Sequence, residues 1–336
     1  MPIPSPARLL LIAVAGALTL LGPAAVAAQA ATPPTHTTAA DGARVTDEQQ
    51  VAPRQVDLTV SSPALGTSVR VRLLTPDGWD QRSDTRRWPT LWLLHGCCGD
   101  YTSWTALTDV ASIPALRHVL VVMPEAGNTG FYSNWRNNGA GGTPAWETFH
   151  LTELRQILEH GYGAGPDRSV AGLSMGGYGA LAYAGRHPGM FRAAASYSGV
   201  VDTLYQPGGP ENVLDIAEGQ GADPYALWGD PVADRGVWAA HDPYYLAFAL
   251  RHIPVFLSCG DGTAGPLDPP GASSAYETLF RAENQHLADR LASLHDRRLV
   301  TDFYGAGTHA WPYWQRELHR SLPMLLSAMH VPARAA

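Results

Sequence analysis

The sequence predicts a doubly wound α/β fold, with a mostly parallel sheet of about eight strands and helices on both faces. Short β-rich runs alternate with longer amphipathic runs along most of the chain. The later β-rich runs are almost continuously apolar, as expected of parallel strands that are buried on both faces. Because no linker-like stretch interrupts this alternation, we expect a single domain over residues 52–336.

The individual elements follow from composition and spacing. The first two strands are joined through Pro63–Gly66 and are expected to pair antiparallel. Residues 202–242 are rich in Gly, Pro, Asp and Trp, and we expect them to form short helices and loops over the functional site. The expected strands are 56–61, 68–74, 90–94, 119–123, 169–172, 193–198, 255–258 and 299–304, and the expected helices are 147–160, 273–294 and 311–329.

The N-terminus has the pattern of a targeting segment. Arg8 precedes an apolar run from Leu9 to Leu21, which is too short for the roughly 20 residues that span a bilayer. Two A-x-A cleavage sites follow it, so residues 1–30 are predicted to be a secretory signal peptide, with an uncleaved anchor as the alternative. Residues 31–51 contain little apolar surface and are expected to be a flexible leader. We therefore expect a secreted protein, extracellular or associated with the cell envelope.

Composition excludes several classes of partner. The formal net charge is -7 and no Lys/Arg run is present, so nucleic acid is not expected as a partner. No further apolar stretch is long enough for membrane insertion. The three cysteines are Cys97, Cys98 and Cys259, too few for a disulfide scaffold, and a Cys97–Cys98 bridge would be strained. Because no clustered ligand set appears, we expect neither a metal nor another cofactor.

The most informative motif is Gly172-Leu173-Ser174-Met175-Gly176, which fits G-x-S-x-G. A predicted strand precedes the motif, and small residues compatible with a helix follow it. Strand, sharp turn and helix form the nucleophile elbow of an α/β-hydrolase, in which the serine hydroxyl is exposed above the sheet edge. Ser174 is therefore the candidate nucleophile. The alternative is an incidental serine in a strand–turn–helix crossover.

A serine nucleophile needs a histidine as base and an acid behind it. His309 follows the last predicted strand and precedes a helix, at the carboxyl edge of the sheet where ligands bind. Two carboxylates compete for the acid. Asp261 directly follows a buried strand and is the first choice on fold logic, whereas Glu277 lies near the start of the next helix.

An oxyanion hole requires two N–H groups near the serine. The residue after the nucleophile, Met175, supplies one of them. The loop after the third predicted strand, Leu94–Asp100, supplies the other, and the N–H of Cys97 is our candidate. The glycines of this loop would allow its backbone to approach the substrate closely.

Six motifs occur in a fixed order along the chain: Gly96 with Trp104 after it, Phe131-Tyr132-Ser133-Asn134-Trp135, Trp146-Glu147-Thr148-Phe149, Gly172-Leu173-Ser174-Met175, Cys259-Gly260-Asp261-Gly262-Thr263 and Gly307-Thr308-His309-Ala310-Trp311-Pro312-Tyr313-Trp314. With these motifs the chain resembles the antigen 85 mycolyltransferases and related secreted esterases of actinobacteria, from about Val56 to Met329. The resemblance implies Ser174 as nucleophile and His309 as base, and it favours Glu277 over Asp261 as the acid. It also leads us to expect substrate contacts from Trp104, Trp311 and Asp100.

The sequence departs from the family pattern where the family binds the sugar that accepts the acyl group. His95 and Cys98 stand where the family has an aspartate and an arginine that bind sugar, and residues 137–143 lack the family's disulfide cysteine.

We therefore predict a secreted serine carboxylic ester hydrolase acting on a small-molecule, lipid or sugar ester. One alternative is an acyltransferase that moves a fatty or mycolic acyl group to a sugar or glycerolipid. Another is a non-catalytic cell-wall or matrix-binding protein on the same fold.

Overall fold

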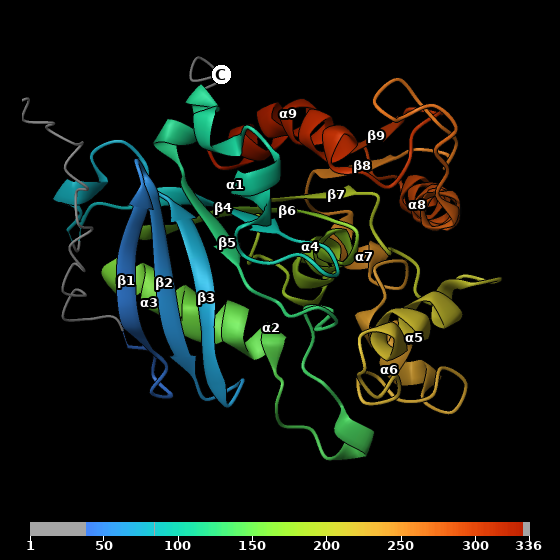
Figure 1. Cartoon of the computed structure of the whole chain (residues 1–336), viewed down its shortest axis with the longest axis horizontal. Coiled ribbons are helices and arrows are strands. Elements are labelled where there is room, and N and C mark those ends of the chain that lie inside the picture. The colour runs from blue at the N-terminus through green and yellow to red at the C-terminus, as the bar shows by residue number, and fades with distance from the viewer. Residues whose placement is uncertain (1–37, 84, 332–336) are drawn as a thin grey trace, which may run out of the picture.

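The computed structural model describes residues 38–83 and 85–331, which contain one nine-stranded sheet (Figure 1). The strand order is β1-β2-β3-β5-β4-β6-β7-β8-β9, with antiparallel pairing from β1 to β5 and parallel pairing from β5 to β9. The strands are β1 (Arg44–Ala52), β2 (Gln55–Ser62), β3 (Thr67–Leu74), β4 (Trp88–Leu94), β5 (Leu120–Pro124), β6 (Ala164–Leu173), β7 (Ala193–Tyr197), β8 (Val255–Cys259) and β9 (Leu299–Phe303).

Nine α-helical segments accompany the sheet within the described residues. The predicted helix 147–160 is continuous but contains a π-helical turn, Phe149–Leu154, between α2 and α3. The helices are α1 (Ser103–Leu107), α2 (Trp146–Thr148), α3 (Arg155–Gly161), α4 (Met175–Arg186), α5 (Gly209–Gly219), α6 (Arg235–His241), α7 (Ala247–Leu250), α8 (Ala275–Ser293) and α9 (Trp311–Ala328). Short 3₁₀ turns are Trp79–Gln81, Val110–Ser112, Pro114–His118 and Asn137–Gly139.

Two hydrophobic cores lie on opposite faces of the sheet, as the apolar strands predicted. In β4, Trp92 and Leu94 belong to one core, whereas Leu91 and Leu93 belong to the other, because successive side chains point to opposite faces. Helices α3, α4 and α8 cover the first core. Helices α1 and α9 cover the second. The predicted mostly parallel sheet with helices on both faces is confirmed.

The edge strand β1 corrects the predicted leader. Residues 31–51 were expected to be flexible, but Arg44–Ala52 pairs antiparallel with β2 along its length. Strand pairing uses backbone groups, so a polar sequence can add an edge strand when a few positions face the core. Here Val45 is buried, and the buried Glu48 carboxylate accepts a hydrogen bond of 2.8 Å from the Tyr162 hydroxyl. Residues 31–37 and the predicted signal peptide 1–30 lie outside the described residues.

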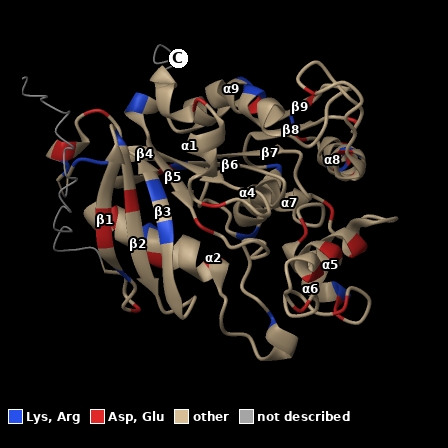
Figure 2. Cartoon of the chain, in the orientation of Figure 1, with Lys and Arg blue, Asp and Glu red and all other residues tan. Residues whose placement is uncertain are grey.

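Charged side chains on the antiparallel end are paired across strands. Asp57 of β2 lies opposite Arg72 of β3 and accepts a hydrogen bond of 2.7 Å from its Nε (Figure 2). The acidic side chains of Glu211, Asp215 and Glu218 instead gather on α5, at the other end of the molecule (Figure 2). In the part of the chain that the structure describes, no helix has both the length and the apolar composition needed to cross a bilayer.

The parallel half of the sheet places the candidate residues at one edge. Ser174 follows β6, Cys97 follows β4, and His309 follows β9. Glu277 lies in the first turn of α8, which comes after β8. The segment 202–242 contains α5 and α6, and α5 borders a cavity at this edge. The topology therefore brings four segments that are distant in sequence to one place.

His150 makes the fold sensitive to acid. It is fully buried, and burial lowers its pKa to about 3, so the folded protein holds it neutral. Protonation therefore favours the unfolded state, and stability present above pH 6.5 should be lost as the pH falls toward 3, by about 1.4 kcal/mol per pH unit. Urea unfolding at pH 7, 6 and 5 would measure this slope. A His150→Gln variant should be less stable at pH 7 yet show a shallower slope, and an unchanged slope would contradict this account.

Candidate active site

Ser174 occupies a strained turn between β6 and α4. Its φ of 53° and ψ of -123° lie in a region that residues with a side chain rarely adopt. Strain of this kind persists where the surrounding structure fixes it, commonly at functional sites. Here the Ser174 N–H donates to the Tyr197 carbonyl of β7 at 3.0 Å, and the Tyr178 N–H donates to the Ser174 carbonyl at 3.1 Å. The turn is thus fixed from the sheet on one side and from α4 on the other.

Two glycines of the motif are required by backbone packing. A Cβ on Gly172 would lie 2.1 Å from the Gly176 carbonyl oxygen. A Cβ on Gly176 would lie 2.3 Å from the Leu94 carbonyl oxygen and 2.5 Å from that of His95. A side chain at Gly172 would force the strand and the helix of the elbow apart, and one at Gly176 would force the elbow away from the end of β4. The G-x-S-x-G pattern therefore has a steric cause in this protein.

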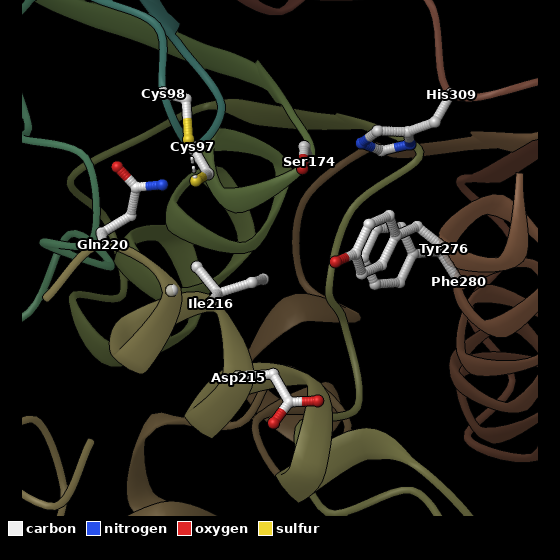
Figure 3. A pocket seen from close by; sticks show the side chains of 10 residues that line it. Cys97, Cys98, Ser174, Asp215, Ile216, Gln220, Tyr276, Phe280 and His309 are labelled. Carbon is white, nitrogen blue, oxygen red and sulfur yellow. Dashed lines mark hydrogen bonds between the residues drawn. The ribbon is translucent and has the colours of Figure 1, made fainter.

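Glu277 and the partly exposed His309 form a hydrogen-bonded pair. The His309 Nδ1–H donates to Glu277 Oε2 at 2.7 Å, and the Glu277 side chain is fully buried. Because this bond uses Nδ1, the Nε2 atom of the ring is left to face Ser174, toward which the ring points (Figure 3). Among the described residues no hydrogen bond joins the Ser174 hydroxyl to His309. Such bonds are often long in structures without substrate and shorten when it binds.

The second oxygen of Glu277 is held by several donors. Oε1 accepts from the Ser198 hydroxyl at 2.7 Å and from the Gly260 N–H at 2.7 Å. The Cys259 thiol lies 3.2 Å from the same oxygen, and the Tyr304 hydroxyl lies 3.3 Å from it. These contacts satisfy a carboxylate that burial would otherwise destabilise, and they leave Oε2 directed at His309.

Aromatic rings and one further carboxylate hold the histidine loop. The His309 ring lies edge-to-face between Phe280 and Trp314, with centroid distances of 5.3 and 4.8 Å. Asp268, in the loop before α8, accepts hydrogen bonds from the Thr308 N–H and hydroxyl and from the Tyr313 hydroxyl. Asp268 thus ties the residue before His309 to the start of α9, which limits how far the imidazole can move.

The loop after β4 provides the second candidate N–H group. Gly96 packs so closely on the elbow that an added Cβ would lie 3.1 Å from the Ser174 Cβ. Among the described residues no hydrogen bond is made by the N–H of Cys97. As the first residue of α4, Met175 has an N–H without an intrahelical partner. Both groups are therefore available to an oxygen bound next to Ser174.

His95 orients the peptide unit that carries the Cys97 N–H. Its ring is buried, and Nδ1 lies 2.8 Å from the Gly96 carbonyl oxygen. A carbonyl can only accept, so Nδ1 carries the hydrogen and donates it. In a trans peptide the C=O and N–H point in opposite directions, so holding the Gly96 carbonyl toward His95 turns the Cys97 N–H away from it. The Ala126 N–H lies 3.0 Å from the other ring nitrogen and fixes the ring in turn.

Two cavities meet at Ser174. One of about 300 Å³ extends between α5 and α8, past Asp215, Ile216, Tyr276 and Phe280 (Figure 3). The other, of about 320 Å³, extends toward α1 and α9. Their shared lining residues are Cys97, Cys98, Ser174 and His309, and the second cavity is further lined by Gly96, Gly99, Ser103, Leu107, Leu173, Trp311 and Trp314.

The remaining predicted site residues lie in different surroundings. Asp261 accepts from the Thr263 N–H at 2.9 Å and makes no hydrogen bond to a histidine within the described residues. Asp100 is exposed and accepts from the Thr102 N–H and hydroxyl, so it closes the turn before α1 and does not line either cavity. Trp104 is buried behind Trp311, with ring centroids 5.4 Å apart. Of the three expected substrate contacts, only Trp311 lines a cavity.

Three residues near the site were not predicted to take part. Ser198 follows β7 at the carboxyl edge, which is the one sequence signal that could have indicated it. His95 was noted only as a departure from the family pattern, and Asp268 lies in a loop without any recognisable motif. The roles of these three residues depend on contacts between segments that are distant in sequence. A single sequence does not specify such contacts.

Comparison with known proteins identifies the family. A family model described as "Putative esterase" matches residues 62–325, more than half of the chain. The chain belongs to this esterase family. Diacylglycerol acyltransferase/mycolyltransferase Ag85B of Mycobacterium intracellulare is 30% identical over 283 residues, which cover 81% of this chain and 82% of the relative. Esterase Rv1288 of Mycobacterium tuberculosis is 30% identical over 264 residues, which cover 75% of this chain and 55% of the relative.

Solved structures of similar fold agree with this assignment. Mycobacterium tuberculosis MPT51 (FbpC1) matches this esterase-family chain with a TM-score of 0.67 at 25% identity, covering 83% of this chain and all of that one. FphF, a fluorophosphonate-binding serine hydrolase of Staphylococcus aureus, has the same fold, with a TM-score of 0.62 at 21% identity over 81% of this chain and 98% of its own. The predicted resemblance to the antigen 85 proteins and the α/β-hydrolase enzyme class are confirmed.

Replacing His95 should misplace the Cys97 N–H donor without removing it. In His95→Phe the Gly96 carbonyl loses its side-chain donor and keeps only the 3.3 Å bond from the Gly99 N–H, so the Cys97 N–H is held less firmly in place. We expect kcat for ester hydrolysis to fall about tenfold with little change in KM, less than the hundredfold or greater loss when a donor is deleted. His95→Gln, which retains a donor, should recover part of the rate. A change in KM alone, at an unaltered melting temperature, would contradict the proposed orientation of this peptide.

Proposed function

We propose that this protein is a secreted serine carboxylic ester hydrolase that works through Ser174, His309 and Glu277 and forms an acyl-enzyme. The observation that carries the proposal is the fully buried Glu277 carboxylate bonded to His309, whose ring points toward a serine in a strained elbow. This arrangement matches the order nucleophile, acid, histidine that α/β-hydrolases use. Membership of the esterase family supports the same reaction.

In the first half of the reaction, the Ser174 Oγ attacks the ester carbonyl carbon while His309 Nε2 takes its proton. Glu277 stabilises the imidazolium through Nδ1. Negative charge develops on the carbonyl oxygen, where the N–H groups of Cys97 and Met175 bind it. The tetrahedral species then expels the alcohol, which receives the proton from His309, and the acyl group remains on Ser174.

The second half repeats the chemistry with water. His309 removes a proton from a water molecule, whose oxygen attacks the acyl carbon bound to Ser174. The same two N–H groups stabilise the second tetrahedral species. When it collapses, the Ser174 oxygen takes back the proton from His309 and the carboxylic acid leaves. None of these steps requires a cofactor.

The lining of the cavities favours uncharged esters. Neither cavity is lined by Lys or Arg, and the carboxylate of Asp215 faces the cavity between α5 and α8. An anionic substrate would therefore find no cationic partner there. Both volumes are at the small end of the range of about 300–1,000 Å³ seen for ligand pockets, so short or medium acyl groups fit best. Ile216, Tyr276 and Phe280 provide apolar contacts for such a group.

Hydrolysis of a p-nitrophenyl ester series tests the proposal directly. The mature protein should hydrolyse acetate to octanoate esters, and Ser174→Ala should reduce kcat by at least about a thousandfold because no nucleophile remains. The anionic hemisuccinate ester should be a poorer substrate than the neutral butyrate ester. No turnover of any ester by the folded wild-type protein would refute hydrolysis.

Matched carboxylate variants test the choice of acid. Glu277→Gln should lower kcat by about a hundredfold or more, because the amide cannot stabilise the imidazolium. Asp261→Asn changes a carboxylate that bonds only within its own loop, and its kcat should stay within about twofold of wild type. Melting temperatures of both variants would separate catalysis from folding. The reverse order of effects would assign the acid to Asp261.

The second cavity supports an acyltransferase as a second candidate. It shares Ser174 and His309 with the first cavity, so an acceptor alcohol bound there could attack the acyl-enzyme in place of water. An acyltransferase name is carried by the Ag85B relative. Adding glycerol or trehalose to the ester assay should then yield acylated acceptor in competition with free acid. If mass spectrometry finds free acid alone at every acceptor concentration, the protein is a hydrolase.

A further inference from the structure

The adjacent residues Cys97 and Cys98 line both cavities. Figure 3 shows their side chains next to each other in the first of these cavities. Their Sγ atoms are 2.7 Å apart, with Cys97 half-buried and Cys98 exposed to solvent. The third cysteine, Cys259, is buried against Glu277. The only accessible thiols of the described residues are therefore next to each other and next to Ser174.

The backbone of this turn already brings the two side chains together. Cys98 has a φ of 63°, in the left-handed region that few residues with a side chain adopt. The Gly99 N–H donates to the Gly96 carbonyl at 3.3 Å and closes the turn around the pair. Little movement is therefore needed for the two sulfurs to bond. A disulfide between neighbouring residues is strained and thus easily reduced, which suits a reversible site.

We propose that Cys97 and Cys98 form a reversible dithiol–disulfide site, oxidised by low-molecular-weight disulfides, whose closure tightens the candidate oxyanion hole. The exposed Cys98 thiolate attacks a disulfide RSSR, which releases one RS⁻ and forms a mixed disulfide on Cys98. Cys97 then loses its proton and attacks the Cys98 Sγ, which releases the second RS⁻ and closes the ring. One RSSR is reduced to two thiols as the two cysteines are oxidised.

The order of the two steps follows from exposure. Burial and the hydrogen bond to Cys98 raise the pKa of the Cys97 thiol to about 12, so little thiolate forms on Cys97 in the free protein. Cys98 is the residue that an external disulfide can reach. Once Cys98 carries a mixed disulfide, the Cys97 thiol lies beside the sulfur that it attacks.

Ring closure acts on the N–H that we assign to the oxyanion hole. The eight-membered ring contains the peptide bond between Cys97 and Cys98 and therefore fixes the backbone that follows the Cys97 N–H. His95 fixes the peptide that precedes it, through the bond to the Gly96 carbonyl. Oxidation thus holds this donor from both sides, whereas reduction leaves one side free. The effect on rate rests on the proposed esterase function, but formation of the ring does not.

The test uses the full mature chain equilibrated with glutathione disulfide or with a phosphine reductant. After alkylation and peptide mass mapping, the peptide that contains Cys97 and Cys98 should be two hydrogens lighter, which indicates a bridge, only in the oxidised sample. Cys259 should be unmodified. For p-nitrophenyl butyrate, kcat should be about threefold to tenfold higher in the oxidised form, with KM nearly unchanged. Cys98→Ser and Cys98→Ala should each show the same kcat under the oxidising and the reducing condition, because neither can form the ring.

Three results would overturn the proposal. These are two alkylated cysteines after oxidation, a mixed disulfide that never closes, and a mapped bridge that leaves kcat unchanged. Melting temperatures of the two Cys98 variants would show whether a loss of rate reflects unfolding. If no ester is hydrolysed in either state, the proposed function fails, and the mass map alone decides whether the dithiol site exists.

Discussion

The buried Glu277 carboxylate is the interaction on which the site depends. A charge in the protein interior is tolerated only when hydrogen bonds replace its lost hydration. The donors to Glu277 come from the ends of β7, β8 and β9 and from the loop before α9. Satisfying one carboxylate therefore fixes the relative positions of four segments at the carboxyl edge. The imidazole is oriented as part of the same network, so its alignment is a property of the fold rather than of one side chain.

The opposite side of the site is organised by backbone contacts. Gly96 and Gly176 allow the loop after β4 to touch the elbow, and Gly172 allows the elbow to close on itself, at distances that leave no room for a Cβ. His95 and Tyr132 add side-chain bonds that hold the same loop, since the Tyr132 hydroxyl donates to the His95 carbonyl at 2.8 Å. The N–H groups are thus held by sterics and a few hydrogen bonds before any substrate arrives. Such preorganisation is what makes hydrogen-bond donors effective in catalysis.

The parts of the fold that depend on local pattern could be predicted from the sequence. Apolar runs located β2 to β9, and the glycines around Ser174 revealed a turn whose steric cause the structure shows. The parts of the site that depend on contacts between distant segments could not be predicted. Position along the chain made Asp261 the natural acid, because the sequence does not reveal that its carboxylate bonds to Thr263. Trp104 and Asp100 were expected to contact substrate from the family resemblance, yet Trp104 is buried in the core and Asp100 is engaged in a local turn.

The polar edge strand has a practical consequence for producing the protein. A chain cut at residue 51, where composition alone places the end of the leader, would lose nearly all of β1. The less polar β2 would then replace β1 as the edge strand, with the backbone groups that pair with β1 open to solvent. Unprotected edges of this kind pair with other chains, so the shortened protein would tend to aggregate even with its active site intact. Recombinant versions should therefore begin before residue 38.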